Sequence, residues 1–274
     1  MSSKESTLKK IASLLFSIAV LSLAACGGST PAPAPAKVSL GTATAGTFTV
    51  ELLADRALAT GANAVYAKVT VTATGVPVTT AAATIRPMMD MVTMQHSCPV
   101  TGPFEYDATD ALYGTGVVFQ MAGTWTATVT LTPSGGSPLT ASFSTLTVAD
   151  AGYARSFTVG TGMMARKYVL SMNFASAPVV GLNPIVVTLY STTDMGMTFT
   201  PVDDASFALE PWMPSMGHGS PGSVAPTLVA EGVYGNGKVS FSMTGAWETR
   251  VTVNRGGATL VSTPAQPVVF LTSF

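Results

Sequence analysis

The sequence contains the pattern Met-x-x-Met-x-His twice, as "MVTMQH" at residues 91–96 and as "MPSMGH" at residues 213–218. Both histidines of the chain stand in this pattern. A thioether is a soft, neutral ligand that prefers Cu(I), and imidazole binds copper in either oxidation state. We therefore predict that the two patterns bind copper as Cu(I), either with one ion in each half of the chain or with one ion shared across the domain interface. The predicted metal ligands are Met91, Met94 and His96 in the first half and Met213, Met216 and His218 in the second.

The local sequence of the second pattern favours a bent chain. In an extended strand Met216 and His218 face one way, whereas Met213 faces the other. Pro214 favours a bend between the two methionines, and Gly217 permits tight backbone beside the histidine. We therefore expect a turn that brings the sulfur of Met213 round to the other two ligands.

Other sulfur-bearing residues lie close to the two patterns. Met89 and Cys98 flank the first one, while Met121 and Met243 recur in a Phe-x-Met-x-Gly-x-Trp segment of each half. These four are secondary candidates for the metal. Because Met121 and Met243 alternate in phase with apolar residues, we expect them to pack in the core. The alternative is that they line the floor of the site.

A further Met-x-Met pair, Met195 and Met197, stands in "DMGMT". We expect loop or strand-edge positions for both, and an auxiliary contact with copper is the alternative. A purely structural role for the histidines is a competing hypothesis, since an imidazole often binds a backbone carbonyl and methionine fills irregular gaps. Recurrence of the same residue types at the same spacing favours metal binding.

The patterns belong to a longer internal repeat. "LYGTGVVFQMAGTWTATVTL" (112–131) matches "VYGNGKVSFSMTGAWETRVTV" (233–253), and "PVTTAAATIRP" (77–87) matches "PVDDASFALEP" (201–211). The separation from histidine to tryptophan is the same in both halves. Order and spacing together indicate a tandem duplication.

The repeated segments have the alternation of β-strands. From Phe119 to Leu131 apolar and polar residues alternate, which predicts one strand with a buried face. Asn236-Gly237 is a hairpin signal, and the chain is rich in Thr, Val and Gly. We predict an all-β protein of two tandem immunoglobulin-like β-sandwiches, with domains at 41–150 and 167–274 and a linker at 151–166.

The N-terminal residues predict export and lipid anchoring. Residues 1–25 combine a positive start with an apolar segment too short to span a bilayer, as in a signal peptide. "LAAC", ending at Cys26, resembles the lipobox of bacterial lipoproteins, which implies lipidation of Cys26 and the bilayer as a partner. Residues 26–40 are expected to form a Pro/Ala-rich tether. Because Gly27 follows the cysteine, we expect a cell-envelope location on the periplasmic face of the outer membrane.

Composition argues against two functional classes. The net charge is −1 with 10% charged residues, which disfavours nucleic acid as a partner. No histidine lies outside the two patterns to serve as a general base, and no glycine-rich phosphate loop precedes a helix. We therefore expect a protein that is not an enzyme.

A family resemblance adds to this interpretation. "FTPVDDASFALEPWMPSMGHGSP", then Tyr234 and "FSMTGAW", resembles the YtkA-like domain, a relative of the FixH group of exported β-sandwich proteins. The resemblance implies a copper site at Met213, Met216 and His218. In the first half it carries over to Met91, Met94 and His96, although Val92 replaces the proline and two extra residues follow Pro87.

The expected function is that of a lipid-anchored envelope protein that binds Cu(I) for trafficking, buffering or resistance. A copper-donor or copper-acceptor protein would be its partner, and a role in oxidase assembly is compatible with this function. The alternative is a non-catalytic interaction module whose tandem domains bind an envelope protein.

Overall fold

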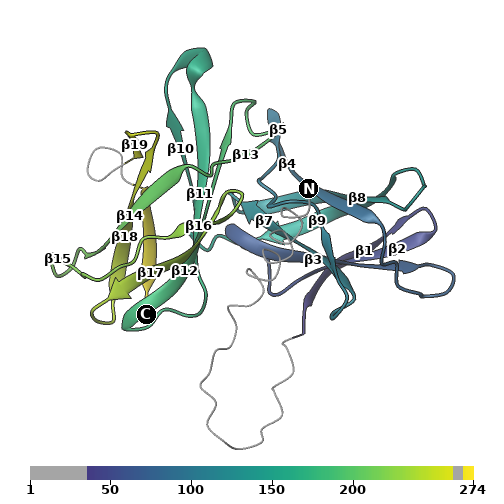
Figure 1. Cartoon of the computed structure of the whole chain (residues 1–274), viewed down its shortest axis with the longest axis horizontal. Coiled ribbons are helices and arrows are strands. Elements are labelled where there is room, and N and C mark those ends of the chain that lie inside the picture. Colours follow the sequence, from purple (N-terminus) through teal and green to yellow (C-terminus); the bar gives the residue numbers. More distant parts are fainter. Residues whose placement is uncertain (1–35, 262–267) are drawn as a thin grey trace, which may run out of the picture.

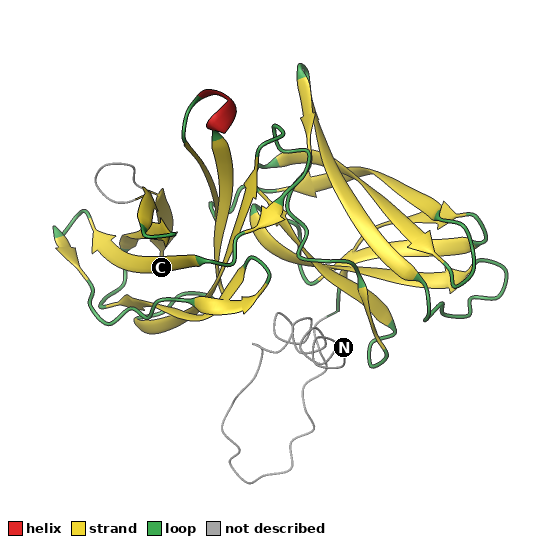
Figure 2. Cartoon of the chain, turned by 45° about the horizontal axis from the view of Figure 1, so that its top comes forward, coloured by secondary structure: helices red, strands yellow, loops and turns green. Residues whose placement is uncertain are grey.

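Two β-sandwiches make up the computed structural model, which describes residues 36–261 and 268–274. In Figure 1 the first sandwich runs from purple to teal and the second from teal to yellow. Figure 2 shows strands throughout, apart from one short 3₁₀ turn at Gly162–Met164. None of the described residues forms a helix long and apolar enough to cross a bilayer. The all-β prediction is confirmed.

The first sandwich consists of two antiparallel sheets. One sheet has the order β1-β2-β3-β7-β6 and the other β5-β4-β8-β9. Their bounds are β1 (Val38–Ala45), β2 (Phe48–Ala54), β3 (Gly61–Val71), β4 (Ala82–Met91), β5 (Met94–His96), β6 (Glu105–Asp107), β7 (Leu112–Phe119), β8 (Gly123–Thr132) and β9 (Leu139–Val148).

The second sandwich repeats this plan. One sheet has the order β10-β11-β12-β17-β16, with β13 beside β12, and the other has the order β15-β14-β18-β19, with β20 beside β18. Their bounds are β10 (Ala154–Val159), β11 (Arg166–Phe174), β12 (Gly181–Thr192), β13 (Thr200–Pro201), β14 (Ala205–Met213), β15 (His218–Gly219), β16 (Thr227–Ala230), β17 (Val233–Phe241), β18 (Ala246–Arg255), β19 (Ala258–Val261) and β20 (Val268–Ser273).

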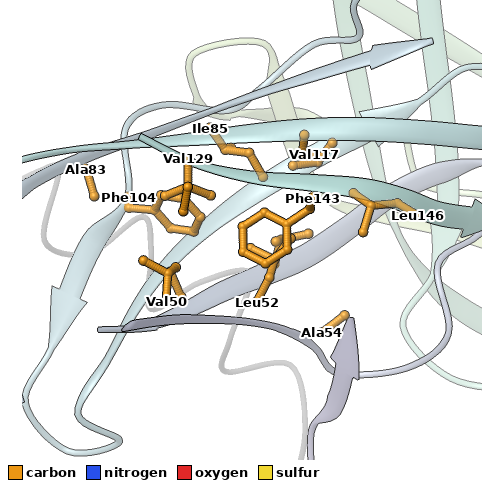
Figure 3. Close-up of a cluster of buried hydrophobic side chains, with 14 of the residues drawn as sticks. Val50, Leu52, Ala54, Ala83, Ile85, Phe104, Val117, Val129, Phe143 and Leu146 are labelled. Atoms are coloured by element: carbon orange, nitrogen blue, oxygen red, sulfur yellow. The ribbon is translucent and has the colours of Figure 1, made fainter. Parts of the chain in front are cut away.

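Alternating strand residues fill the space between the sheets. Figure 3 shows Val50 and Leu52 of one sheet facing Val129 and Phe143 of the other. Because successive side chains point to opposite faces of a strand, each strand contributes every second residue to this layer. The tryptophans of the two repeats, Trp125 and Trp247, lie in equivalent places in the two cores and are almost completely buried.

Two domain boundaries differ from the expected ones. Residues 38–40, assigned to the tether, begin β1, and residues 154–159, assigned to the linker, form β10. Strand β10 pairs with β11 along its whole length, so most of the expected linker belongs to the second sandwich. The signal peptide and Cys26 lie outside the described residues.

The predicted strand from Phe119 to Leu131 is interrupted. Strand β7 ends at Phe119 and β8 begins at Gly123, and the two strands belong to different sheets. The chain therefore crosses the sandwich at Met121, and Met243 lies in the same crossover of the second domain. Both side chains are 39% exposed, so our expectation that they pack in the core is wrong. The alternation in the sequence continues through the crossover because the last residue of β7, Phe119, and the first buried residue of β8, Trp125, are separated by an even number of positions.

The two sandwiches are in direct contact. Val118 of the first domain forms a buried cluster with Val169 and Tyr190 of the second. Asn173 receives a hydrogen bond from the Ala62 backbone N–H (2.9 Å) and donates one to the Ala62 carbonyl (3.3 Å). This interface fixes elements of the second domain against the first.

A buried tyrosine in each repeat ties a loop to the sandwich. The Tyr234 hydroxyl accepts a hydrogen bond from the Ala205 N–H (3.1 Å) and donates one to the Val202 carbonyl (2.6 Å). In the first domain the Tyr113 hydroxyl accepts one from the Ala81 N–H (3.1 Å). These tyrosines open the repeated Tyr-Gly-x-Gly segments, which explains their recurrence in the sequence.

We predict that Tyr234→Phe lowers the free energy of unfolding by about 1–3 kcal/mol, because it leaves two backbone groups without a partner. Urea denaturation followed by tryptophan fluorescence measures the change. Tyr153→Phe is the control, since that hydroxyl has no hydrogen bond within the described residues, and it should have no effect. Equal stability of the two variants would contradict the prediction.

Candidate metal centre

A hairpin at one end of each sandwich carries the methionine and the histidine. In the second domain, β14 and β15 pair Met213 with His218, and the N–H groups of Met216 and Gly217 both donate to the Met213 carbonyl. The chain turns between Met213 and Met216, as Pro214 predicts. We call residues 213–218 the second hairpin.

The first hairpin, residues 89–96, is two residues longer. Strands β4 and β5 pair Met89 with His96, then Asp90 with Gln95, and then Met91 with Met94. Directly opposed residues of antiparallel strands have their side chains on the same face, about 5 Å apart at Cβ. Met89 is therefore the cross-strand partner of His96, as Met213 is of His218.

This register changes the correspondence between the repeats. Met89, and not Met91, occupies the position of Met213. The two methionines are 7% and 3% exposed, and each Cε lies over a glycine at the edge of the crossover. A Cβ atom built on Gly123 would lie 2.9 Å from the Cε of Met89, and one on Gly245 would lie 3.0 Å from the Cε of Met213.

The tip of the first hairpin carries the remaining two predicted ligands. Met91 and Met94 are 37% and 44% exposed and stand one side-chain pair beyond Met89 and His96. Because residues two apart in a strand share a face, all four side chains lie on the same face of the hairpin. In the second hairpin the corresponding exposed methionine is Met216, in the turn.

In both repeats the imidazole Nδ1 lies close to a backbone carbonyl. Nδ1 of His96 lies 3.0 Å from the Ser97 carbonyl oxygen, and Nδ1 of His218 lies 3.0 Å from the Gly219 carbonyl oxygen. A carbonyl oxygen can only accept, so this contact favours the tautomer with the proton on Nδ1 and the lone pair on Nε2. A hydrogen bond of this kind from the second nitrogen is typical of metal-binding histidines.

A tryptophan ring lies edge-on to each imidazole. The ring centroids are 5.1 Å apart for His96 and Trp125, and 5.8 Å apart for His218 and Trp247. Each indole N–H donates to a carbonyl of the crossover: Trp125 to Met121 (3.1 Å) and Trp247 to Met243 (3.0 Å). The tryptophan thus ties the crossover methionine to the same end of the sandwich as the histidine.

The environment of His96 departs from that of a structural histidine. Its side chain is 5% exposed, and Nε2 is buried with no hydrogen-bond partner among the described residues. The Gln120 amide nitrogen lies 3.1 Å from Nδ1 and donates to the Ser97 carbonyl, while the amide oxygen has no partner in the same part of the chain. A buried polar atom without a partner destabilises the fold by about 1–3 kcal/mol. A purely structural role predicts the contact of Nδ1 with the Ser97 carbonyl, which is present. It does not explain why Nε2 of His96 is buried without a partner among the described residues.

Thioether sulfurs, rather than acidic groups, accompany the two rings. Within residues 36–261 and 268–274 no cluster of three or more His, Cys, Asp or Glu side chains is found. Cys98 lies buried in the first core, and burial raises the pKa of its thiol well above the usual value. The thiol is therefore protonated at neutral pH, a form that binds metal poorly.

The sequence alone could have paired Met89 with Met213. Alignment of the two repeats on the histidine pairs Met91 with Met213 instead. Pro87 and Pro211 end the matched segments at 77–87 and 201–211, and a methionine stands two residues after each proline. Counting forward from the prolines pairs Met89 with Met213, which is the correspondence found in the strands. No comparable signal marks Gln120, whose place beside His96 depends on the crossover.

We predict that His96→Phe leaves the free energy of unfolding of the metal-free protein unchanged within about 1 kcal/mol. The phenyl ring keeps the contact with Trp125 and removes a buried nitrogen that has no partner. Thermal and urea unfolding in the presence of a chelator measure the effect, with His218→Phe as the matched variant. A loss of about 3 kcal/mol or more would show that His96 serves the fold.

A family model described as YtkA-like matches residues 42–130 and residues 167–252. Each matched region contains one complete hairpin and the tryptophan behind it. None of the curated proteins compared with the chain matches it.

Proposed function

The chain belongs to the YtkA-like family, with one copy of the domain in each half, and from that premise we propose that it is a copper-binding protein of the cell envelope. It holds Cu(I) at the two hairpins for trafficking, buffering or resistance. The observation that carries the proposal is the buried Nε2 of His96, which has no hydrogen-bond partner within the described part of the chain and lies on the same hairpin face as a buried thioether.

The chemistry of these donors supports Cu(I) over the other common ions. A neutral imidazole and neutral thioethers form a soft set that needs no deprotonation. Zn(II) prefers thiolate, imidazole and carboxylate, and Ca(II) and Mg(II) prefer oxygen. The two hairpins therefore favour Cu(I) over Zn(II), Ca(II) and Mg(II).

Two residues in each domain would hold the ion, and all of them except the partly buried His218 are buried. They are Met89 and His96 in the first hairpin and Met213 and His218 in the second. Met121 and Met243 supply a further sulfur from the crossover, where the tryptophan fixes their backbone. The exposed methionines at the hairpin tips, Met91, Met94 and Met216, meet incoming copper first.

Membrane anchoring is part of the proposal. Lipidation of Cys26 would place the two domains beside a bilayer, where a copper-donor or copper-acceptor protein would reach the hairpins. No catalytic step is proposed for the chain.

A second candidate function is an interaction module. It is favoured by apolar side chains that stand fully in solvent at hairpin tips, namely Val92 of the first hairpin and Met163 of the β10–β11 hairpin. Exposed apolar groups of this kind mark contact surfaces when they are contiguous. This function predicts that the protein is indifferent to copper.

We predict that the reduced protein takes up two equivalents of Cu(I) in competition with a chromophoric chelator. His96→Phe and His218→Phe should each retain one equivalent, and the double variant none, because each imidazole serves one ion. Zn(II) added in equal amount should displace no Cu(I). Full uptake by the double variant would exclude the hairpins as the sites, and no uptake by the native protein would favour the interaction module.

The methionines of the first hairpin allow a matched comparison in the His218→Phe background. Met89→Leu keeps the buried volume and removes the sulfur, so the dissociation constant for Cu(I) should rise about 10-fold or more. Met91→Leu makes the same chemical change at the exposed tip and should have a smaller effect. A larger rise in the dissociation constant for Met91→Leu than for Met89→Leu would show that Met91, and not Met89, corresponds to Met213.

We predict that Cys26→Ala moves the protein from the membrane fraction to the soluble fraction, since stable anchoring needs the acyl chains. Fractionation with detection by antibody measures this, and Cys98→Ala is the control because that thiol is buried in the first domain. Retention of Cys26→Ala in the membrane fraction would rule out anchoring through this residue.

A further inference from the structure

The two copies of the site differ in how they are covered. His96 is 5% exposed, whereas His218 is only partly buried and its neighbour Gly219 is exposed. The contacts of Nδ1 and of the tryptophan are alike in the two copies, although the first hairpin is two residues longer. Something outside the repeated unit must therefore cover the first site.

The cover comes from the second domain. The Ser97 N–H donates to the carbonyl of Gly196 (2.8 Å), which lies in the loop 194–198 after β12. Gly196 is buried, and a Cβ atom built on it would lie 3.4 Å from the Cβ of His96. The backbone of this loop therefore lies directly on the histidine, and its φ of +89° suits glycine.

The loop is held in shape by its own hydrogen bonds. The Asp194 carboxylate accepts from the Thr192 hydroxyl (2.7 Å), from the N–H groups of Met197 and Thr198 (3.0 Å each) and from the Thr198 hydroxyl. These donors lower the pKa of Asp194, with the Thr198 hydroxyl contributing most. The carboxylate is thus ionised at any physiological pH, and its hydrogen bonds stabilise the turn of the loop.

Domain contact keeps this loop on the first hairpin. Tyr190, at the end of β12, packs with Val118 and Val169 in the buried interface, and Phe199 after the loop packs against the same cluster. Both ends of the loop are therefore anchored at the place where the two sandwiches meet. Residues of the second domain form part of the surroundings of His96 in the absence of any ion.

Two methionines flank the glycine that covers His96. Met195 is 78% exposed, whereas Met197 is partly buried. We infer that the first copper site is completed by the second domain: the thioether of Met197 joins His96 and Met89 around the ion, and the loop 194–198 closes the site. This inference rests on the proposed function and concerns the residues that make up one of its two sites.

The tandem order explains why only one site is closed. The corresponding loop of the first domain, residues 72–75 after β3, reads "TATG" and contains no sulfur. Among the described residues no third domain follows to cover the second hairpin. The chain thus combines a closed site, which exchanges copper slowly, with an open site that exchanges it rapidly.

The test uses Met197→Leu in the His218→Phe background, where only the first site binds. Leucine keeps the packing and removes the sulfur, so the dissociation constant for Cu(I) should rise about 10-fold and release to the chelator should accelerate in proportion. X-ray absorption should show one sulfur scatterer fewer. Met195→Leu is the matched control in the same loop and should change none of these readings.

Two results would overturn the inference. One is a Met197→Leu protein that binds and releases Cu(I) as Met195→Leu does. The other is equal release from the two native sites, compared in the His96→Phe and His218→Phe proteins. Both results leave the proposed function intact because Cu(I) is still bound, whereas absence of Cu(I) binding by the native protein defeats the proposed function itself. Asn173→Ala, which weakens the domain contact without touching the loop, should also accelerate release from the first site.

Discussion

The hydrogen bond between each imidazole Nδ1 and the carbonyl of the following residue is the interaction on which the site depends. It fixes the proton on one nitrogen and leaves the lone pair of the other available. Since the two partners are neighbours in the chain, the bond forms in both hairpins although these differ in length. The tryptophan behind each ring then limits its orientation, and the crossover that binds the indole brings a methionine to the same end of the sandwich.

The two histidines share these contacts but differ in burial: His96 is buried and His218 is only partly buried. In the second domain the ring reaches solvent, so water can satisfy its lone pair. In the first domain the loop 194–198 lies beside His96, whose ring is buried, and Nε2 has no partner among the described residues. A repeated sequence has thus produced two unequal environments for the histidine, because within the described residues the loop 194–198 of the second domain contacts the first hairpin and no corresponding loop contacts the second.

Much of the fold could be predicted from local patterns. Period-two alternation identifies strands because burial on one face of a sheet requires it, and the repeat identifies two domains. The strand predicted from Phe119 to Leu131 was wrong at Met121 because alternation does not record a change of sheet. The predicted ligand Met91 was paired with Met213 by counting back from the histidine. The strand register, which depends on the length of the turn, pairs Met89 with His96 instead.

The sequence by itself determined the fold class, the family, the duplication and the residue types at the candidate sites, since each of these is encoded in composition or spacing along the chain. Tertiary structure decided which methionine faces each histidine, that Met121 and Met243 are exposed, and that Gly196 lies on His96. These facts arise from strand register and from contact between residues far apart in the chain. Such contacts follow from the packing of two complete domains, and no local pattern specifies them.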